Sequence, residues 1–198
     1  MLHEKTEWQD SSFITLTYDD ANLPQGGSLM KKDLQDFWKR LRKLRTPIKY
    51  YACGEYGERY GRPHYHAIVY GVGVSDKDLV DSVWKKGRID VGIAEPDSIR
   101  YVAQYIDKKI YGAAAKEHYN GREQEFQLCS KGIGRQWMEK NQEELLKEGF
   151  TQFRMARLRV PRYYEKRLSV TVPADAWEKY KRRKEEESMV READWLLT

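Results

Sequence analysis

The sequence predicts an α+β fold, in which a central antiparallel sheet is flanked by helices and followed by a mainly helical C-terminal extension. Three observations support it: short β-branched or alternating segments, longer segments with apolar residues at helical spacing, and the order of the two kinds. The 198 residues suit one domain with an appended extension. We expect a core domain over residues 1–112 and an extension, packed on that core, over residues 113–198.

The core elements are expected in the order strand, helix, strand, strand, helix, strand, helix. The runs that are rich in β-branched and aromatic residues predict strands over residues 13–18, 49–56, 64–70 and 88–94. Apolar residues at helical spacing predict helices over residues 30–45, 75–84 and 99–111. The sequence GERYGRP between the second and third strands has the Gly and Pro of a hairpin loop. This order is the split βαβ, ferredoxin-like pattern.

Beyond residue 112 the pattern is weaker. We expect a turn at 130–134 (SKGIG), a helix over 136–147, an extended segment over 158–164 (LRVPRYY) and a highly charged helix over 176–189. The chain lacks a run of about 18 apolar residues, which excludes a transmembrane helix. Its two cysteines, Cys53 and Cys129, are too few for a disulfide framework or a four-Cys zinc site, so we expect a reducing, cytoplasmic setting.

The positive charge is concentrated in one segment. The chain has 36 Lys and Arg against 31 Asp and Glu, a net charge of +5, and residues 30–45 hold seven basic residues against two acidic ones. A basic helix face is either a solvated surface or a binding surface for a polyanion such as nucleic acid. The 14 Tyr and 6 Trp residues add aromatic rings on which bases can stack. Composition leaves both alternatives open.

His64 and His66 stand two residues apart in the third predicted strand, so both imidazoles lie on one face of the sheet. They are either polar residues on a solvated face or metal ligands, since neutral imidazole is a common ligand. If the second and third strands pair around GERYGR, Glu55 lies opposite His64 and Cys53 opposite His66. Two imidazoles and one carboxylate, with positions left open, are typical of a catalytic metal site.

Other candidate ligands near the pair are weaker. We expect Cys53 to pack rather than to bind metal, and Glu58, which lies in the loop itself, is a weaker rival of Glu55. By ligand softness alone, two imidazoles and one carboxylate suit Mn or Zn better than Mg.

The two sides of the helix expected over residues 99–111 differ in character. At about 100° per residue, one side is aliphatic and consists of Ile99, Val102, Ala103, Ile106 and Ile110. The other side carries Tyr101, Gln104, Tyr105 and Lys108. Because the aliphatic side already supplies a core stripe, we interpret the tyrosines as functional. A Tyr–DNA ester keeps a phosphodiester bond exchangeable, and Lys108 is placed to neutralise charge or to lower the pKa of Tyr105.

FITLTYDD, GEYGERYGRPHYHAIVYG and RYVAQYIDKK together resemble, in order and spacing, the three motifs of HUH rolling-circle replication initiators, and especially those of gokushovirus-type microviruses. SKGIG and VPRYY also resemble the C-terminal part of that family, so the similarity runs from about Phe13 to Arg167. The resemblance implies a site-specific, metal-dependent single-strand DNA endonuclease and strand transferase. Such an enzyme nicks a replication origin, stays bound to the 5′-phosphate and leaves a 3′-OH for a host polymerase.

Residue by residue, the resemblance implies the same site as the spacing. His64 and His66 match the HUH pair, Glu55 matches the acidic position that completes the metal site, and the metal is Mn or Mg. The paired catalytic tyrosines match Tyr101 and Tyr105, and the motif lysine matches Lys108. We expect DNA contacts from Lys39, Arg42, Lys43, Arg62 and Lys109. The expected partners are single-stranded origin DNA and a host polymerase and helicase, in the host bacterial cytoplasm.

Two other functions remain open at this point. A split βαβ sheet with aromatic residues and a basic edge also suits a non-catalytic module that binds single-stranded nucleic acid, with steep salt dependence and without a metal requirement. The same chemistry also serves HUH transposases and plasmid relaxases. The His pair and Glu55 on one face favour the enzyme, and the paired tyrosines favour replication initiation.

Overall fold

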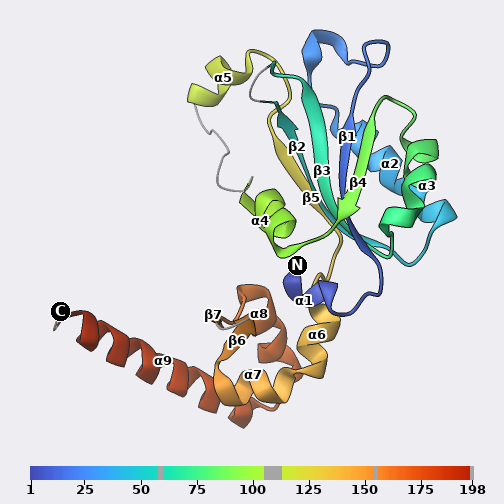
Figure 1. The fold of residues 1–198 in the computed structure, drawn as a ribbon. Helices are drawn as coiled ribbons and strands as arrows, with labels where there is room; N and C mark the ends of the chain where they lie inside the picture. The colour runs from blue at the N-terminus through green and yellow to red at the C-terminus, as the bar shows by residue number, and fades with distance from the viewer. Residues whose placement is uncertain (58–59, 105–112, 154–155, 197–198) are drawn as a thin grey trace. The chain divides into compact units, whose positions relative to one another are not determined.

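The computed structural model describes residues 1–57, 60–104, 113–153 and 156–196 (Figure 1). The chain divides into two compact units, residues 1–133 and residues 134–198. The division follows residue 133 rather than residue 112, because a strand after residue 112 pairs with the sheet of the first unit. We describe each unit by itself.

The first unit is built on one five-stranded antiparallel sheet with the strand order β4-β1-β3-β2-β5. The strands are β1 (Ser11–Thr17), β2 (Lys49–Tyr56), β3 (Pro63–Tyr70), β4 (Ile89–Ile93) and β5 (Phe126–Cys129). The first four strands have the split βαβ arrangement, so the predicted fold class is confirmed. The strand β5 was not predicted from the sequence, and it forms the edge of the sheet beside β2.

Helices cover both faces of this sheet (Figure 1). The helices of the first unit are α1 (Leu2–Lys5), α2 (Lys31–Leu44), α3 (Lys77–Trp84), α4 (Pro96–Gln104) and α5 (Ala113–Tyr119), with short 3-10 turns η1 (Gln25–Gly27) and η2 (Val74–Asp76). The helices α2 and α3 pack together on one face, and α4 contacts β2 and β3 on the other. The predicted helix over 99–111 begins earlier, at Pro96, and its part beyond Gln104 lies outside the described residues.

The alternation of side chains along β3 separates two cores. Tyr65, Ala67 and Val69 join a large cluster under α2 and α3, which includes Trp38 and Trp84. On the other face, a smaller cluster packs under α4 and α1, with these buried members: Cys53, Ile68, Tyr70, Ala94, Ile99 and Val102. Successive residues of a strand point to opposite faces, so this one strand contributes to both layers.

The second unit has its own small core. Its elements are α6 (Arg135–Lys140), α7 (Gln142–Glu148), β6 (Phe150–Phe153), β7 (Ala156–Arg159), α8 (Arg162–Thr171) and α9 (Ala174–Leu196). The strands β6 and β7 form an antiparallel pair. The buried residues of this core are Met138, Leu145, Val160, Tyr164 and Leu168.

Two expectations for the second unit were wrong in part. The segment 158–164 is extended only at its start, because Pro161 precedes a helix and Tyr164 turns inward into the core as part of α8. The helix expected over 136–147 is two helices that meet at Asn141. The SKGIG turn ends in Gly134, which has φ +79 and whose Cβ, if present, would collide with the Tyr164 hydroxyl.

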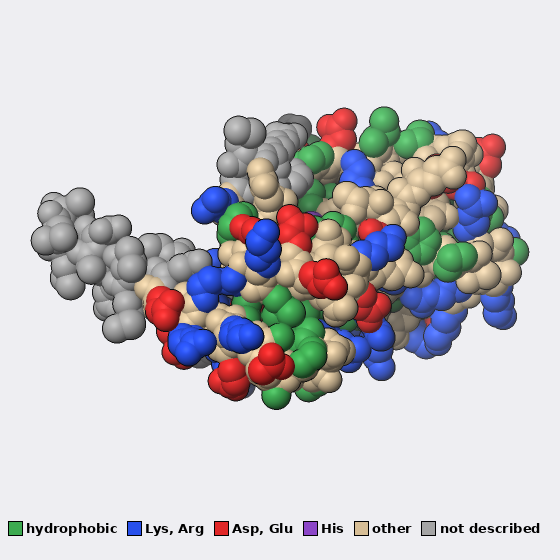
Figure 2. All heavy atoms as spheres, turned by 90° about the horizontal axis from the view of Figure 1, so that it is seen from below, with side chains coloured by type: hydrophobic (Ala, Val, Ile, Leu, Met, Phe, Trp, Pro, Cys, Tyr) green, Lys and Arg blue, Asp and Glu red, His purple; other side chains and the backbone are tan. Residues whose placement is uncertain are grey.

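Over the described residues, no helix combines the length and the apolar character that a membrane crossing requires. Lys and Arg side chains stand among Asp and Glu side chains on the face drawn in Figure 2. This mixed surface agrees with a net charge of only +5 over 67 charged residues, 36 basic and 31 acidic.

Candidate metal centre

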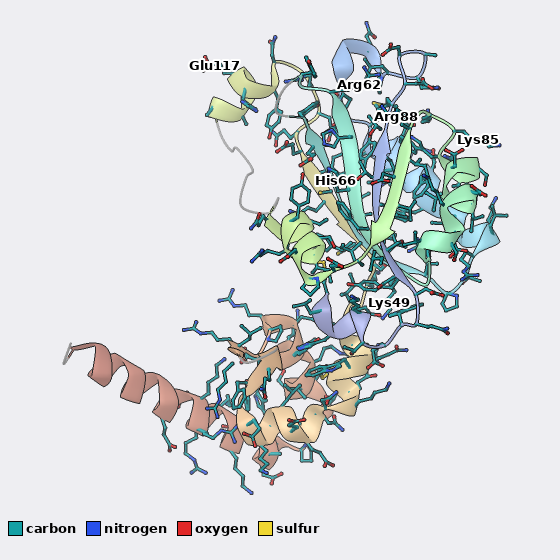
Figure 3. The ribbon with its side chains drawn as sticks, viewed as in Figure 1. Lys49, Arg62, His66, Lys85, Arg88 and Glu117 are labelled. Carbon is teal, nitrogen blue, oxygen red and sulfur yellow. The ribbon has the colours of Figure 1, made fainter. Side chains whose placement is uncertain are left out.

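The pairing of β2 with β3 brings three potential metal ligands together. Glu55 lies opposite His64, and Cys53 lies opposite His66, which is the register expected from the hairpin. The ligand atoms of Glu55, His64 and His66 all lie within 4.8 Å of one another. Figure 3 shows His66 near the middle of the sheet. We call these three residues the triad.

Both imidazoles converge on one carboxylate oxygen. His64 Nε2 lies 2.7 Å and His66 Nε2 lies 2.8 Å from Glu55 Oε1. Glu55 is 4% exposed and His66 is 8% exposed, so the carboxylate is removed from water and depends on these partners. Cys53 is fully buried in the apolar cluster beneath, which raises the pKa of its thiol. Two nitrogens and one oxygen at this separation fit a divalent cation that retains open coordination positions.

The other nitrogen of each ring is also held. His64 Nδ1 donates to the Arg62 carbonyl oxygen at 2.9 Å, and His66 Nδ1 lies 3.0 Å from Thr15 Oγ1. Because a carbonyl oxygen can only accept, Nδ1 of His64 carries a proton, and Nε2 is the nitrogen whose lone pair is available to a cation. Hydrogen bonds of this kind orient metal-binding histidines.

The His64 ring is electrostatically coupled to Glu55. Burial by itself would lower the pKa of His64, but the hydrogen bonds to the Glu55 carboxylate and the Arg62 carbonyl outweigh it, and the pKa is raised. His64 Nε2 lies within hydrogen-bond distance of the carboxylate, and a cation bound at the triad would use the same nitrogen. The raised pKa shows that the carboxylate favours positive charge at this position.

Tyr101, on α4, brings its hydroxyl to the triad. Its hydroxyl lies 3.4 Å from Glu55 Oε1, and its ring meets His66 edge-on at 5.4 Å between centroids. Tyr101 is 40% exposed, whereas Ile99 and Val102 of the same helix are buried. The predicted division of this helix into an aliphatic and a tyrosine side is confirmed for these residues. Tyr105, Lys108 and Lys109 lie outside the described residues, as does Glu58.

Three of the basic residues expected to contact DNA lie over the other face of the sheet. Lys39, Arg42 and Lys43 belong to α2, which covers the sheet face opposite the triad (Figure 1). Arg42 stacks its guanidinium over the Tyr50 ring at 5.1 Å, and Lys39 pairs with Asp36 at 3.4 Å. The structure therefore does not bring these three residues to the triad.

Arg62 lies at the hairpin end of the sheet (Figure 3). Its guanidinium donates to the Tyr18 carbonyl oxygen at 2.9 Å and pairs with Asp20 at 2.8 Å, so it joins the hairpin to the end of β1. Its backbone carbonyl orients His64. A DNA contact from Arg62 stays a prediction.

Two residues that shape the site, Thr15 and Phe13, were not predicted from the sequence. Phe13 stacks on the His66 ring, with centroids 5.4 Å apart and planes at 11°, and it meets Tyr101 edge-on at 6.2 Å. Strand alternation in FITLT already places Phe13 and Thr15 on one face. Their position beside His66 depends on the pairing of β1 with β3, which sets Thr15 opposite His66 and which the sequence pattern did not specify.

Several known proteins are similar to the chain in sequence. Replication-associated protein VP4 of Bdellovibrio phage phiMH2K is 29% identical to the chain, over 82% of this chain and 59% of the relative. Replication-associated protein ORF4 of Chlamydia phage 1 is 27% identical, over 87% of this chain and 49% of the relative. Replication-associated protein ORF2 of Spiroplasma virus 4 is 28% identical, over 84% of this chain and 60% of the relative. The chain thus spans about half to three fifths of the length of these relatives. No solved structure matches the chain.

The family model for the phage replication-associated protein ORF2 matches residues 11–110. This range begins at β1 and contains the triad and Tyr101. It covers half of the 198 residues, and the predicted resemblance to phage replication initiators is confirmed at the level of the family. The chain belongs to the replication-associated protein ORF2 family.

Proposed function

We propose that this protein initiates replication by nicking single-stranded DNA at an origin and joining itself to the 5′-phosphate through a tyrosine. The observation that carries the proposal is the position of the Tyr101 hydroxyl, 3.4 Å from the carboxylate oxygen on which both imidazoles converge. A phosphate held at the triad would lie next to a tyrosine hydroxyl. The names of the phage relatives, which are replication-associated proteins, support the same role.

The triad fits a divalent cation, which we propose is Mn²⁺ or Mg²⁺. The fit rests on the donor set: a buried carboxylate and two imidazoles whose outer nitrogens are already engaged. When bound, the cation supplies charge that polarises the phosphate and stabilises the additional negative charge in the transition state. Glu55, His64 and His66 hold this charge on the sheet, and Phe13 and Thr15 keep the His66 ring in place.

The reaction is a phosphoryl transfer between two oxygens. The Tyr101 oxygen attacks the phosphorus and loses its proton, the bond from phosphorus to the 3′-oxygen breaks, and that oxygen takes up a proton to become the free 3′-OH. The new phosphotyrosine ester retains the energy needed for rejoining. Tyr105 is proposed as the second nucleophile and Lys108 as the cation that balances charge beside it. A host polymerase extends the 3′-OH in the bacterial cytoplasm, after a host helicase has opened the duplex.

The test is covalent attachment. The full chain is incubated with Mn²⁺ and an internally labelled pool of random single-stranded 40-nucleotide DNA, and adducts are separated on a denaturing protein gel. We expect a labelled band that resists boiling in detergent and disappears with EDTA. Because the pool contains every short sequence, sequencing the attached DNA then reports the preferred site.

Matched variants assign the nucleophile. Tyr101→Phe and Tyr105→Phe each remove one hydroxyl and leave the ring, and the double variant removes both. We expect the double variant to lose the adduct. Adducts that persist in the double variant contradict the tyrosine assignment, and DNA binding without any adduct in the wild type favours the non-catalytic binding module.

A further inference from the structure

The second unit contains a groove between α8 and α9, far from the triad in sequence. Each helix contributes one stripe of residues at spacings of three and four, so each stripe follows one side of its helix. The stripe from α8 consists of Arg162, Glu165, Lys166 and Ser169. The stripe from α9 consists of Trp177, Tyr180, Lys181 and Lys184. Together they line a cavity of about 350 Å³.

The groove is strongly basic although the surface as a whole is mixed. Four cationic side chains line it against one carboxylate, Glu165. That carboxylate accepts a hydrogen bond from the Tyr180 hydroxyl at 2.8 Å and pairs with Lys184. Four positive charges less one negative charge leave an excess of +3 around one groove, which is a local potential that attracts an anionic partner.

The four cationic side chains of the groove differ in whether they form ion pairs. Lys181 pairs with Glu178, outside the groove, at 2.7 Å, and both side chains are largely exposed, so this pair is weak and exchangeable. Arg162 and Lys166 form no ion pair with any side chain in the described part of the chain. These two cations stand one helical turn apart on α8 and are available to successive phosphates.

The groove also has an aromatic floor. The rings of Trp177 and Tyr180 stack with centroids 5.1 Å apart and planes at 20°. Tyr180 is fully buried and supports the Trp177 ring from beneath, whereas Trp177 is only partly buried against the small core of the second unit, so the Trp177 ring is the aromatic surface that a base can reach. Cations that follow a backbone and an aromatic face on which a base can stack are the two features of surfaces that bind single-stranded nucleic acid.

We propose that the groove between α8 and α9 binds a second segment of the single-stranded DNA on which the triad acts, through its phosphates and without base specificity. This inference rests on the proposed function, because that function supplies the strand. An acidic peptide would use the cations but would leave the Trp177 ring unused. The chain also belongs to a replication-associated family. We therefore favour DNA.

The experiment measures metal-free binding by the full chain. A fluorescent 20-nucleotide oligothymidylate is titrated in EDTA at several salt concentrations, and anisotropy gives the affinity and its salt dependence. The groove variant is Lys166→Ala with Lys181→Ala. We expect a loss of affinity of about tenfold near 0.1 M salt and a salt slope lower by about 1.4, since each lost contact on a single strand removes about 0.7.

The control removes the same charge from the same unit outside the groove. Lys140 and Lys179 do not line the groove, and Lys179 is an exposed residue of α9 itself. We expect Lys140→Ala with Lys179→Ala to keep the wild-type slope. Equal slopes for the groove variant and this control would overturn the proposal, as would displacement of the DNA by an equal charge of oligo-glutamate with the same efficiency.

Failure of this inference is separable from failure of the proposed function. The anisotropy measurement requires neither metal nor tyrosine, so it reports on the groove even if no covalent adduct forms. Conversely, unchanged DNA binding by the groove variant leaves the adduct assay intact as a test of nicking. Trp177→Phe keeps an aromatic ring of smaller area, and we expect it to weaken binding severalfold without changing the salt slope.

Discussion

The two faces of the sheet in the first unit use the same strands for opposite purposes. On the face under α2 and α3, Tyr65 and its alternate neighbours along β3 enter a dry cluster that contains the fully buried rings of Trp84 and Phe37. On the face under α4, His64 and His66 hold a buried carboxylate beside an exposed tyrosine. The first face provides stability, and the second retains polar groups that a partner from solution can satisfy.

Several polar atoms of the dry face are satisfied internally. The Tyr18 hydroxyl donates to Asp33 at 2.8 Å and lies 2.7 Å from the Tyr65 hydroxyl, which in turn contacts the backbone of Met30. The indole nitrogen of Trp84 donates to the Thr17 carbonyl oxygen at 3.1 Å. Paired polar groups in a core hold their side chains in fixed positions. These hydrogen bonds therefore hold Tyr18, Tyr65 and Trp84 on the sheet face opposite the triad.

The largest expected effect is on the triad itself. His66→Ala removes one of two imidazoles, and we expect adduct formation to fall by about a thousandfold, because metal stabilisation of the transition state is worth several kcal/mol. Binding of oligothymidylate in EDTA should change less than about threefold. Gel quantification of adducts and anisotropy check the two parts. Parallel loss of binding and nicking would place His66 in DNA affinity instead.

The second effect concerns stability on the opposite face. Trp84 is fully buried among Tyr18, Phe37 and Tyr65. Trp84→Ala opens a large cavity and should lower the free energy of unfolding by about 3–5 kcal/mol. Urea unfolding followed by circular dichroism measures this loss. Adduct formation per folded molecule should stay within about twofold of wild type, and a thousandfold loss there would contradict the division of labour between the faces.

A smaller effect tests the positioning of His66. Thr15→Val keeps the shape of the side chain but removes the hydroxyl 3.0 Å from His66 Nδ1. We expect Mn²⁺ affinity, measured by calorimetry, to fall about tenfold, in the range found for outer partners of metal-binding histidines. Thr17→Val is the matched control, since Thr17 lies on the same face of β1 and its side chain makes no hydrogen bond within the described residues. Equal affinities for the two variants would exclude a positioning role for Thr15.

The smallest effect is the loss of folding stability at alkaline pH that comes from Tyr65, on the sheet face under α2 and α3. Burial raises the pKa of Tyr65 to about 12, above its ordinary value near 10. The folded state thus favours the neutral phenol, so its stabilising contribution is complete below pH 10 and is lost as the pH rises from 10 toward 12. Urea unfolding measures the free energy of unfolding at neutral pH and at pH 11. We expect the loss between the two to be about 1 kcal/mol smaller in Tyr65→Phe than in wild type. Identical pH profiles would contradict the burial argument.

Much of the candidate site follows from local rules. The HxH spacing places both imidazoles on one face, and the length of the hairpin loop places Glu55 opposite His64, as the register confirms. The helical period separates Tyr101 from Ile99 and Val102, which are buried. These features depend only on the repeat of a strand or helix and on one short turn, so they can be obtained from the sequence.

Other features depend on contacts between distant segments. The strand β5 lies beside β2, and the first unit extends to residue 133. The segment Arg162–Tyr164 follows Val160 and Pro161, and its local pattern predicts an extended chain. Burial of Tyr164 against Met138 and Leu168 nevertheless makes it part of α8. Local propensity is weak, and tertiary packing overrides it here.

By itself, the sequence determined the order of the elements, the face on which His64, His66 and Glu55 stand, and the family resemblance, because these follow from periodicity and spacing along the chain. Only the tertiary structure decided that Thr15 and Phe13 hold the His66 ring, that the basic helix α2 covers the face opposite the triad, and that α8 and α9 enclose a basic groove. The physical reason is that the hydrophobic effect is non-directional: it favours burial of apolar area but does not specify which distant segments bury that area together. Packing selects which distant surfaces meet, and the chain alone does not encode that choice in any local pattern.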